Sequence, residues 1–267
     1  MNFRIGAALV ALVVGAALLS LVWTPHPPAA MDIPGKFAPA SFEHWLGTDQ
    51  LGRDLVSQLM AASANSMAVA LVAVLIGGSL GVVLGVSAAA LGGWWEDVAM
   101  RLADLGFAFP ALLFAILLAA ALGPSLTNAV LAIAFINIPV FARVSRAAAH
   151  QVWTQDYVMA ARAAGLGRFA ITRDHVLPNI AAPVIVQATI EFAVAILAEA
   201  ALSYLGLGAQ PPAQSWGRML AEAQTLIYLA PQLAIWPGLC IMAAVIGFGL
   251  LGDALRDMTD PRLSRER

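Results

Sequence analysis

Charged residues are scarce in this sequence: they make up 11% of its 267 residues, whereas hydrophobic residues make up 61%. That balance excludes an ordinary soluble domain. Positive charge is not in excess either, and a formal net charge of -2 argues against a nucleic-acid partner. The one cysteine, Cys240, excludes an internal disulfide and a cysteine-cluster metal site. What remains is an apolar chain typical of a polytopic membrane protein.

Recognisable catalytic motifs are also missing. The sequence has no GxxxxGK(S/T) loop to hold nucleotide phosphates, no HExxH zinc motif and no GxSxG nucleophile. The histidines fall outside the apolar runs and are interpreted as solvated loop residues rather than as metal ligands or bases. They are His26, His44, His150 and His175. We therefore expect a non-catalytic membrane protein without a metal or cofactor of its own; a membrane enzyme would need a clustered catalytic set.

Six long apolar runs predict an all-α fold with about six transmembrane helices. The first run covers residues 3–23; a cleaved signal peptide is the alternative, disfavoured because the run is longer than a typical signal core. The other runs extend over about residues 67–91, 98–122, 127–148, 181–202 and 230–251. We expect residues 1–64 to hold the first helix and an extracytoplasmic or interfacial segment, 65–252 the membrane core, and 253–267 a cytoplasmic tail.

Short-range patterns predict several local contacts. Glycines spaced four apart at 77, 81 and 85 are typical of close helix packing in membranes. Arg101 and Asp104, three apart, are expected to pair on one helix face. Residues 47–54 predict a compact turn held by an Asp–Arg pair, with a solvated loop as the alternative. The apolar residues between 51 and 59 predict a helix lying along the interface before the second span.

The segment 151–180 is the longest polar interruption in the second half of the chain. We expect Asp156 to cap a short helix that reaches Ala164, and Gly165 to end it in a left-handed turn. Pro178 is expected to stop a second helix from running on unbroken. The alanine-rich helix offers little side chain, so another surface can approach its backbone closely. The pattern predicts a docking element at one membrane face.

Positive charge indicates the orientation. With the amino terminus inside and six spans, all but Lys36, Arg53 and Arg218 of the 14 Lys and Arg residues fall on or near the cytoplasmic side. Both termini and the segment 151–180 are then cytoplasmic. Polar residues within the runs are candidates for a translocation path, namely Asn137 and Glu191, with interhelical hydrogen bonding as the alternative. For Glu199, helix packing is the preferred interpretation.

The segment DYVMAARAAGLGRFAITRDHVLPN resembles the EAA loop of permease subunits of ABC importers. Met159 stands where that family usually has glutamate. Other stretches, such as HWLGTDQLGRDLVSQL and ILAEAALSYLGLGAQPPAQSWGRMLAEA, are similar to the dipeptide/oligopeptide/nickel branch, in particular its second permease subunit. The similarity covers about residues 44–263. The resemblance implies that the residues at the matching positions contact the ATPase. These ATPase-coupling residues are Met159, Ala160, Ala161, Arg162, Gly165 and Pro178.

The resemblance implies a heterodimer with a second permease in the bacterial inner membrane. It also implies two cytoplasmic ATPase subunits, which bind ATP and Mg²⁺, and an extracytoplasmic solute-binding protein. A peptide is the expected cargo, with a nickel chelate or an opine-type solute as alternatives. From a different class, an ion-coupled secondary transporter or a channel stays open as an interpretation of Glu191 and Glu199.

Overall fold

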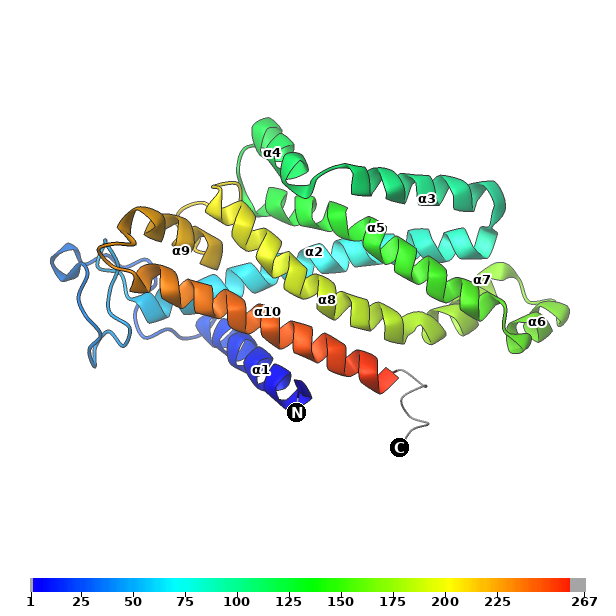
Figure 1. Ribbon diagram of the computed structural model, residues 1–267, viewed down its shortest axis with the longest axis horizontal. Helices are drawn as coiled ribbons and strands as arrows, with labels where there is room; N and C mark the ends of the chain where they lie inside the picture. The colour runs from blue at the N-terminus through cyan, green and yellow to red at the C-terminus, as the bar shows by residue number, and fades with distance from the viewer. Residues whose placement is uncertain (1, 260–267) are drawn as a thin grey trace.

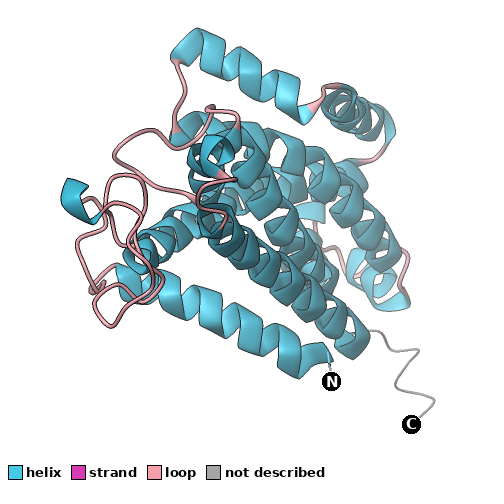
Figure 2. Ribbon diagram, turned by 60° about the vertical axis from the view of Figure 1, so that its left-hand side comes forward, coloured by secondary structure: helices cyan, strands magenta, loops and turns pink. Residues whose placement is uncertain are grey.

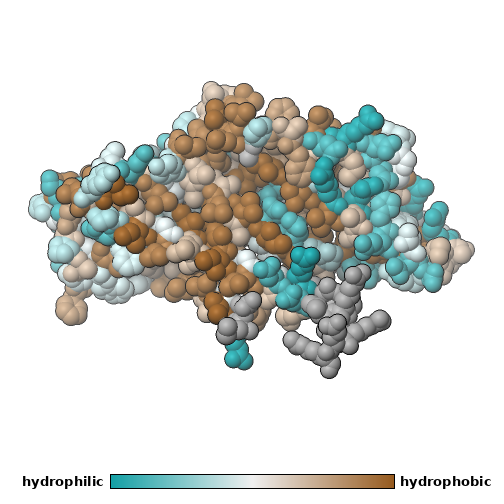
Figure 3. Space-filling model, viewed as in Figure 1, coloured by the Kyte–Doolittle hydropathy of each residue, from teal (hydrophilic) through white to brown (hydrophobic). Residues whose placement is uncertain are grey.

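The computed structural model describes residues 2–259, which form a bundle of helices without a β-strand (Figures 1 and 2). Five helices are long and apolar enough to cross a membrane, or six if the bent pair α3 and α4 forms one span. An apolar surface covers the middle of the molecule, and hydrophilic residues gather toward its α6 and α7 end (Figure 3). The predicted all-α membrane fold is confirmed.

The helices fall into two classes. The long ones are α1 (Asn2–Ser20), α2 (Leu55–Leu91), α5 (Leu126–Trp153), α8 (Leu177–Tyr204) and α10 (Gln232–Thr259). The shorter ones are α3 (Gly93–Ala108), α4 (Ala111–Leu122), α6 (Asp156–Ala163), α7 (Arg168–Ile171) and α9 (Trp216–Ala223). The loop 24–54 and the segment 205–231, which contains α9, gather at one end of the bundle, the loop-rich end, whereas α6 and α7 lie at the opposite end (Figure 1).

Helix α2 begins earlier than the sequence predicts. Asp54 is its N-cap, and Asp54 Oδ2 accepts hydrogen bonds from the backbone N–H of Ser57 at 2.8 Å and from its hydroxyl at 2.7 Å. The predicted separate interfacial helix is therefore wrong, because Leu55 and Leu59 belong to the first turns of α2. With 37 residues, α2 is about 55 Å long and extends past a hydrocarbon core of about 30 Å.

The glycines of α2 allow α5 to pack directly on its backbone. A Cβ atom added at any of the three would overlap a carbonyl oxygen of α5. The pairs are Gly77 with Ala134, Gly81 with Ile138, and Gly85 with Ala142. The predicted small-residue contact is confirmed, and it makes α2 and α5 the centre of the bundle.

The third predicted span is not one straight helix. Helices α3 and α4 meet at a bend of 82°, where Pro110 lacks a backbone N–H and Phe109 takes an extended conformation. The predicted pair of Arg101 with Asp104 is also wrong. Asp104 instead accepts a 2.5 Å hydrogen bond from Arg143 Nη2 on α5, because α3 packs along that helix.

The compact turn before α2 does contain the predicted ion pair. Arg53 Nε donates to Asp49 Oδ2 at 2.6 Å, and both side chains are buried. Arg53 Nη2 also donates to Glu222 Oε2 on α9 at 2.8 Å. Glu222 receives a second bond from Arg218. This network fixes the loop before α2 against the helix between α8 and α10.

Glu222→Gln is expected to loosen this junction and lower the free energy of unfolding by about 1 kcal/mol. The glutamine keeps one acceptor oxygen but removes the charge that faces two arginines, at a partly exposed position. Thermal unfolding in detergent, followed by circular dichroism, measures the change. Asp253→Asn, at an exposed position of α10, is the control, and an equal shift in both variants would contradict the interpretation.

Helix α10 continues to Thr259, so the expected tail begins as helix. Arg262, Arg265 and Arg267, which contribute to the predicted positive charge of the tail, lie outside the described residues. Helix α1 lies alongside α10, and Gly6 faces the backbone of Gly247 and Leu251 (Figure 1). The first apolar run is therefore a packed part of the bundle.

Candidate functional site

The short helix predicted within residues 151–180 is present between two long helices. Helix α6 follows α5 after a turn at Thr154 and Gln155. The expected cap is wrong in detail, because Gln155 is the N-cap and its side chain makes no capping bond. Asp156 lies in the first turn, where a negative charge is favoured by the helix dipole.

Gly165 reverses the chain after α6 as predicted. Its φ is +88°, a conformation that residues with a Cβ rarely adopt. The N–H of Gly165 donates to the Arg162 carbonyl at 3.0 Å, and that of Leu166 donates to the Ala161 carbonyl at 3.1 Å. These two bonds form a Schellman motif, which satisfies carbonyls at the end of α6. No atom outside the adjoining residues lies within 4 Å of a Cβ placed at Gly165.

The inner face of α6 is anchored in a small apolar core. Val158 is fully buried there, with Ile171, Val176 and Ile180 of the following helical segment and Val152 of α5. This core is separate from the main one between the long helices. Helix α6 is thus attached to the ends of both α5 and α8, and a displacement of α6 acts on both helices.

The outer face of this element exposes apolar side chains. Tyr157, Met159, Leu166 and Phe169 are all exposed, and Phe169 has 80% of its surface accessible. Ala160 and Arg162 are exposed between them. These groups lie at the hydrophilic end of the molecule, beyond the apolar middle (Figures 1 and 3). An apolar cluster in this position is typical of a protein-binding surface.

Pro178 does not interrupt the helix that follows. The residues from Arg168 to Tyr204 form one helical span, with a π-helical turn at Thr172–Val176. Pro178 falls in the first turn of α8, where its missing N–H costs little, and the π turn changes the hydrogen-bonding pattern just before it. The expected break is wrong, and the docking element continues directly into α8.

Polar contacts attach the same end to the rest of the bundle. Glu96 of α3 accepts hydrogen bonds from Arg146 Nε at 2.6 Å and pairs with His150 Nε2 at 2.8 Å. Arg168 donates to the Leu91 carbonyl at the end of α2, at 3.1 Å. His150 is therefore a helix residue in α5, not a loop residue. Sequence reasoning missed these contacts, because they join residues far apart in the chain.

The candidate pathway residues lie at helix contacts. Gln187 Nε2 donates to Glu191 Oε1 at 2.8 Å within α8, and Glu191 is buried. Glu199 is fully buried and accepts a 2.6 Å bond from the Ser203 hydroxyl. Asn137 is buried on α5, where its Cβ faces Gly77. Within the single chain, all three side chains are covered by helices.

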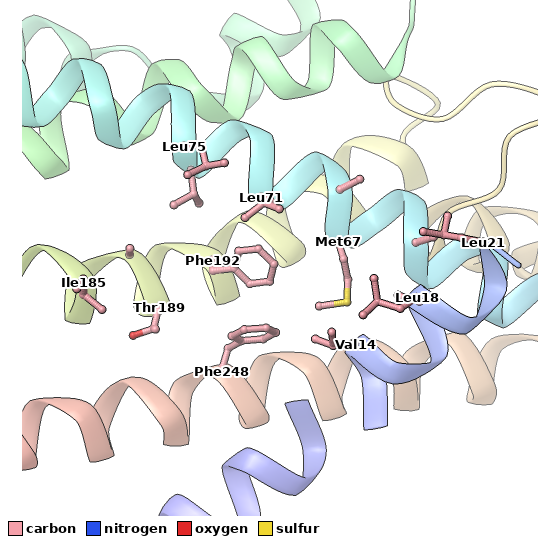
Figure 4. Close-up of a pocket in the computed structure, with 15 residues that line it drawn as sticks. Val14, Leu18, Leu21, Met67, Leu71, Leu75, Ile185, Thr189, Phe192 and Phe248 are labelled. Atoms are coloured by element: carbon pink, nitrogen blue, oxygen red, sulfur yellow. The ribbon is translucent and has the colours of Figure 1, made fainter. Parts of the chain in front are cut away.

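An apolar cavity of about 570 Å³ lies between α1, α2, α8 and α10 (Figure 4). Thr189 is its one polar lining residue within the described chain. The larger lining side chains include Leu18, Met67, Leu71, Phe192 and Phe248. Neither Glu191 nor Asn137 lines it. The cavity offers no charge to a polar solute, so it suits hydrocarbon rather than a peptide.

Comparison with known proteins gives consistent matches. The family described as "Binding-protein-dependent transport system inner membrane component" matches residues 81–265. The chain is 43% identical over 223 residues to the dipeptide transport system permease protein DppC of Alkalihalophilus pseudofirmus, covering 84% of this chain and 73% of that protein. It is 36% identical over 265 residues to the nickel transport system permease protein NikC of Escherichia coli K12, covering 99% and 96%.

The fold also resembles a solved structure. A chain of the MetNI methionine ABC transporter, solved in inward facing conformations, superposes with a TM-score of 0.64 at 17% sequence identity. The match covers 76% of this chain and 97% of that one. At this identity the likeness concerns the fold alone, and it agrees with the all-helical bundle.

Proposed function

The chain belongs to the family of binding-protein-dependent transport system inner membrane components, and from this premise we propose that it forms half of the translocation pathway of an ABC importer for a peptide or peptide-like solute. It is a membrane-spanning permease of the importer type. In this proposal it has no catalytic activity of its own. Partner ATPases bind ATP and Mg²⁺ and hydrolyse the nucleotide, and this chain converts their closure into a movement of its spans.

The observation that carries the proposal is the docking element. Its outer face exposes Tyr157, Met159 and Phe169, while its inner face is anchored through Val158 to α5 and α8. A partner that binds the outer face therefore moves two spans at once. The coupling residues proposed are Met159, Ala160, Ala161, Arg162 and Gly165, with Pro178 at the start of α8. Such coupling requires the partner to bind the two conformations with different affinities.

The proposed assembly contains a second, homologous permease, two cytoplasmic ATPases and an extracytoplasmic solute-binding protein. Both termini and the docking element face the cytoplasm of a bacterium, and the loop-rich end faces the binding protein. Asn137 and Glu191 are buried within this chain, so they are proposed to reach the pathway only when the spans move. An ion-coupled carrier is less well supported, because Glu191 and Glu199 each accept a hydrogen bond from a neighbouring side chain of α8.

A peptide is proposed as the cargo, because relatives named for dipeptide transport share more identity with the chain than the nickel permease does. A nickel chelate or an opine-type solute is the alternative. A free metal ion has no ligand set within the long helices, whose one cysteine is Cys240 and whose one histidine is His150, bonded to Glu96. Uptake of labelled dipeptide and of labelled nickel, each in competition with the other, discriminates between these cargoes.

The test of the function is co-purification. The chain is expressed with its neighbouring genes, reconstituted in nanodiscs and assayed for ATP hydrolysis with and without the binding protein. We expect two ATPases and a second permease to purify with it, and the binding protein to change the hydrolysis rate. A chain that purifies alone as a stable homo-oligomer would overturn the proposal and favour a channel or a secondary carrier.

Phe169→Asp is expected to lower the amount of co-purified ATPase about tenfold. The side chain is 80% exposed, so the substitution leaves the fold intact but places a charge in an apolar contact. Phe42→Asp is the matched control, because Phe42 is also highly exposed but lies at the loop-rich end, away from the proposed ATPase. Equal ATPase recovery from both variants would contradict the proposed docking surface.

Met159→Glu is expected to leave uptake within about twofold of the wild type. Met159 is exposed on α6, so a carboxylate there stays solvated, and glutamate is the residue that the family usually has. Initial uptake rates in proteoliposomes measure the effect. A complete loss of assembly in this variant, with Met258→Glu unaffected on the exposed face of α10, would mean that the ATPase groove is built around methionine.

A further inference from the structure

Two histidines meet at the loop-rich end of the molecule. His26 follows α1 and His44 precedes α2, yet their ring centroids are 4.6 Å apart. His44 Nδ1 lies 3.0 Å from Asp54 Oδ1, and His26 Nδ1 lies 3.8 Å from the same oxygen. The interpretation of these histidines as separate solvated loop residues does not account for this arrangement.

The carboxylate behind the two rings is held firmly in place. Asp54 is buried, and its other oxygen accepts the two bonds from Ser57 that begin α2. The 3.0 Å hydrogen bond to Asp54 Oδ1 occupies Nδ1 of His44. This leaves Nε2 as the free lone pair, as in carboxylate–histidine–metal arrangements.

The backbone of His26 is held beside the same serine that bonds Asp54. Its N–H donates to the Ser57 hydroxyl at 2.9 Å, and its Nδ1 is buried without a hydrogen-bond partner. A buried ring nitrogen without a hydrogen-bond partner costs folding free energy unless a bound group pairs with it. The two imidazoles are therefore fixed by one serine and one aspartate at the start of α2.

Glu43 supplies a third donor. One carboxylate oxygen of Glu43 and one ring nitrogen from each of His26 and His44 all lie within 4.8 Å of one another. Ligands about 2.1 Å from a tetrahedral zinc ion lie about 3.4 Å apart, so the donors need to close by up to about 1.4 Å. Glu43 is exposed and its side chain can make that movement without disturbing the core.

We infer that His26, Glu43 and His44 form a binding site for one divalent transition-metal ion, for which zinc is the best match, with Asp54 as a positioning residue. Two imidazoles and a carboxylate are ligands that Zn²⁺ accepts readily, and they leave a fourth position open. The bound ion would join the two ends of the loop 24–54 above the first turn of α2. This inference goes beyond the proposed function, because the site is complete in this chain and needs no ATPase or cargo.

Zinc binding to the full-length chain in nanodiscs tests the inference. The chain is purified through a tag without histidine, stripped with a chelator and titrated with Zn²⁺ alone by calorimetry; Co²⁺ then reports the ligand set by its visible absorption. We expect one Zn²⁺ per chain. Affinity should fall at least about tenfold in Glu43→Gln, and about 10- to 100-fold in Asp54→Asn, which keeps the three ligands but loses their orienting charge.

Two control variants distinguish a loss of zinc binding from a loss of folding. Glu43 is exposed, so Glu43→Gln cannot act by unfolding the loop, and His175→Gln, at the opposite end, should bind zinc like the wild type. Absence of stoichiometric zinc binding, or equal binding by the wild type and the double variant His26→Gln with His44→Gln, would overturn the inference. Because the assay uses no partner subunit, these results do not depend on whether the importer assembly forms.

Discussion

Replacing Gly165 with proline is expected to reduce ATP-driven uptake at least about 100-fold while leaving membrane insertion intact. Proline fixes φ near −65°, whereas Gly165 has a φ of +88° and donates its N–H to the Arg162 carbonyl. The variant loses both the turn and the bond, a cost of about 3 kcal/mol or more. The Schellman turn after α6 then cannot form, so α6 no longer presents its outer face at the angle set by the buried core beneath it.

Gly167→Pro is the matched control for this result. Gly167 lies two residues further on, has a φ of −73° and donates no backbone hydrogen bond, so proline fits there. Gly165→Asn gives an intermediate case, because asparagine tolerates the left-handed conformation better than other residues. Uptake and ATP hydrolysis are measured together in proteoliposomes. Equal uptake by Gly165→Pro and Gly167→Pro would show that the turn does not take part in coupling.

The features that the sequence predicted correctly are those that depend on residues near one another in the chain. The turn at Gly165 follows from the few residues around it, and the packing of the glycines in α2 follows from their spacing. The resemblance to importer permeases was confirmed by the family match, since it rests on several motifs in their order along the chain.

The contacts that the sequence missed depend on the arrangement of whole helices. Asp104 binds Arg143 rather than Arg101 because α3 lies along α5, and no local pattern indicates that packing. Pro178 is accommodated by a π-helical turn just before it, which a rule for regular α-helices does not include. His26 and His44 meet only because the loop 24–54 folds back over the first turn of α2. The exposure of Phe169 likewise becomes visible only in three dimensions.

Gly81→Leu is expected to lower the free energy of unfolding by about 3 kcal/mol, the upper part of the range for overpacked cores. A Cβ at Gly81 would lie 2.5 Å from the Ile138 carbonyl oxygen and 2.6 Å from Phe141 Cβ. The carbonyl belongs to the backbone of α5 and cannot rotate away. The two helices must therefore separate, and the contacts made through Gly77 and Gly85 are lost at the same time.

Gly15→Leu is the control, because Gly15 is exposed on α1, and an added Cβ meets no atom within 4 Å beyond its chain neighbours and the backbone of its own helix. Unfolding in mixed micelles, followed by circular dichroism, should show Gly15→Leu at least as stable as the wild type, because leucine favours a helix more than glycine does. Gly81→Ala should lie between Gly81→Leu and the wild type, since it adds one methyl group. If Gly81→Leu unfolds like Gly15→Leu, the α2 and α5 backbones are not in direct contact, and a displacement of α5 by the docking element would not be passed to α2 through this interface.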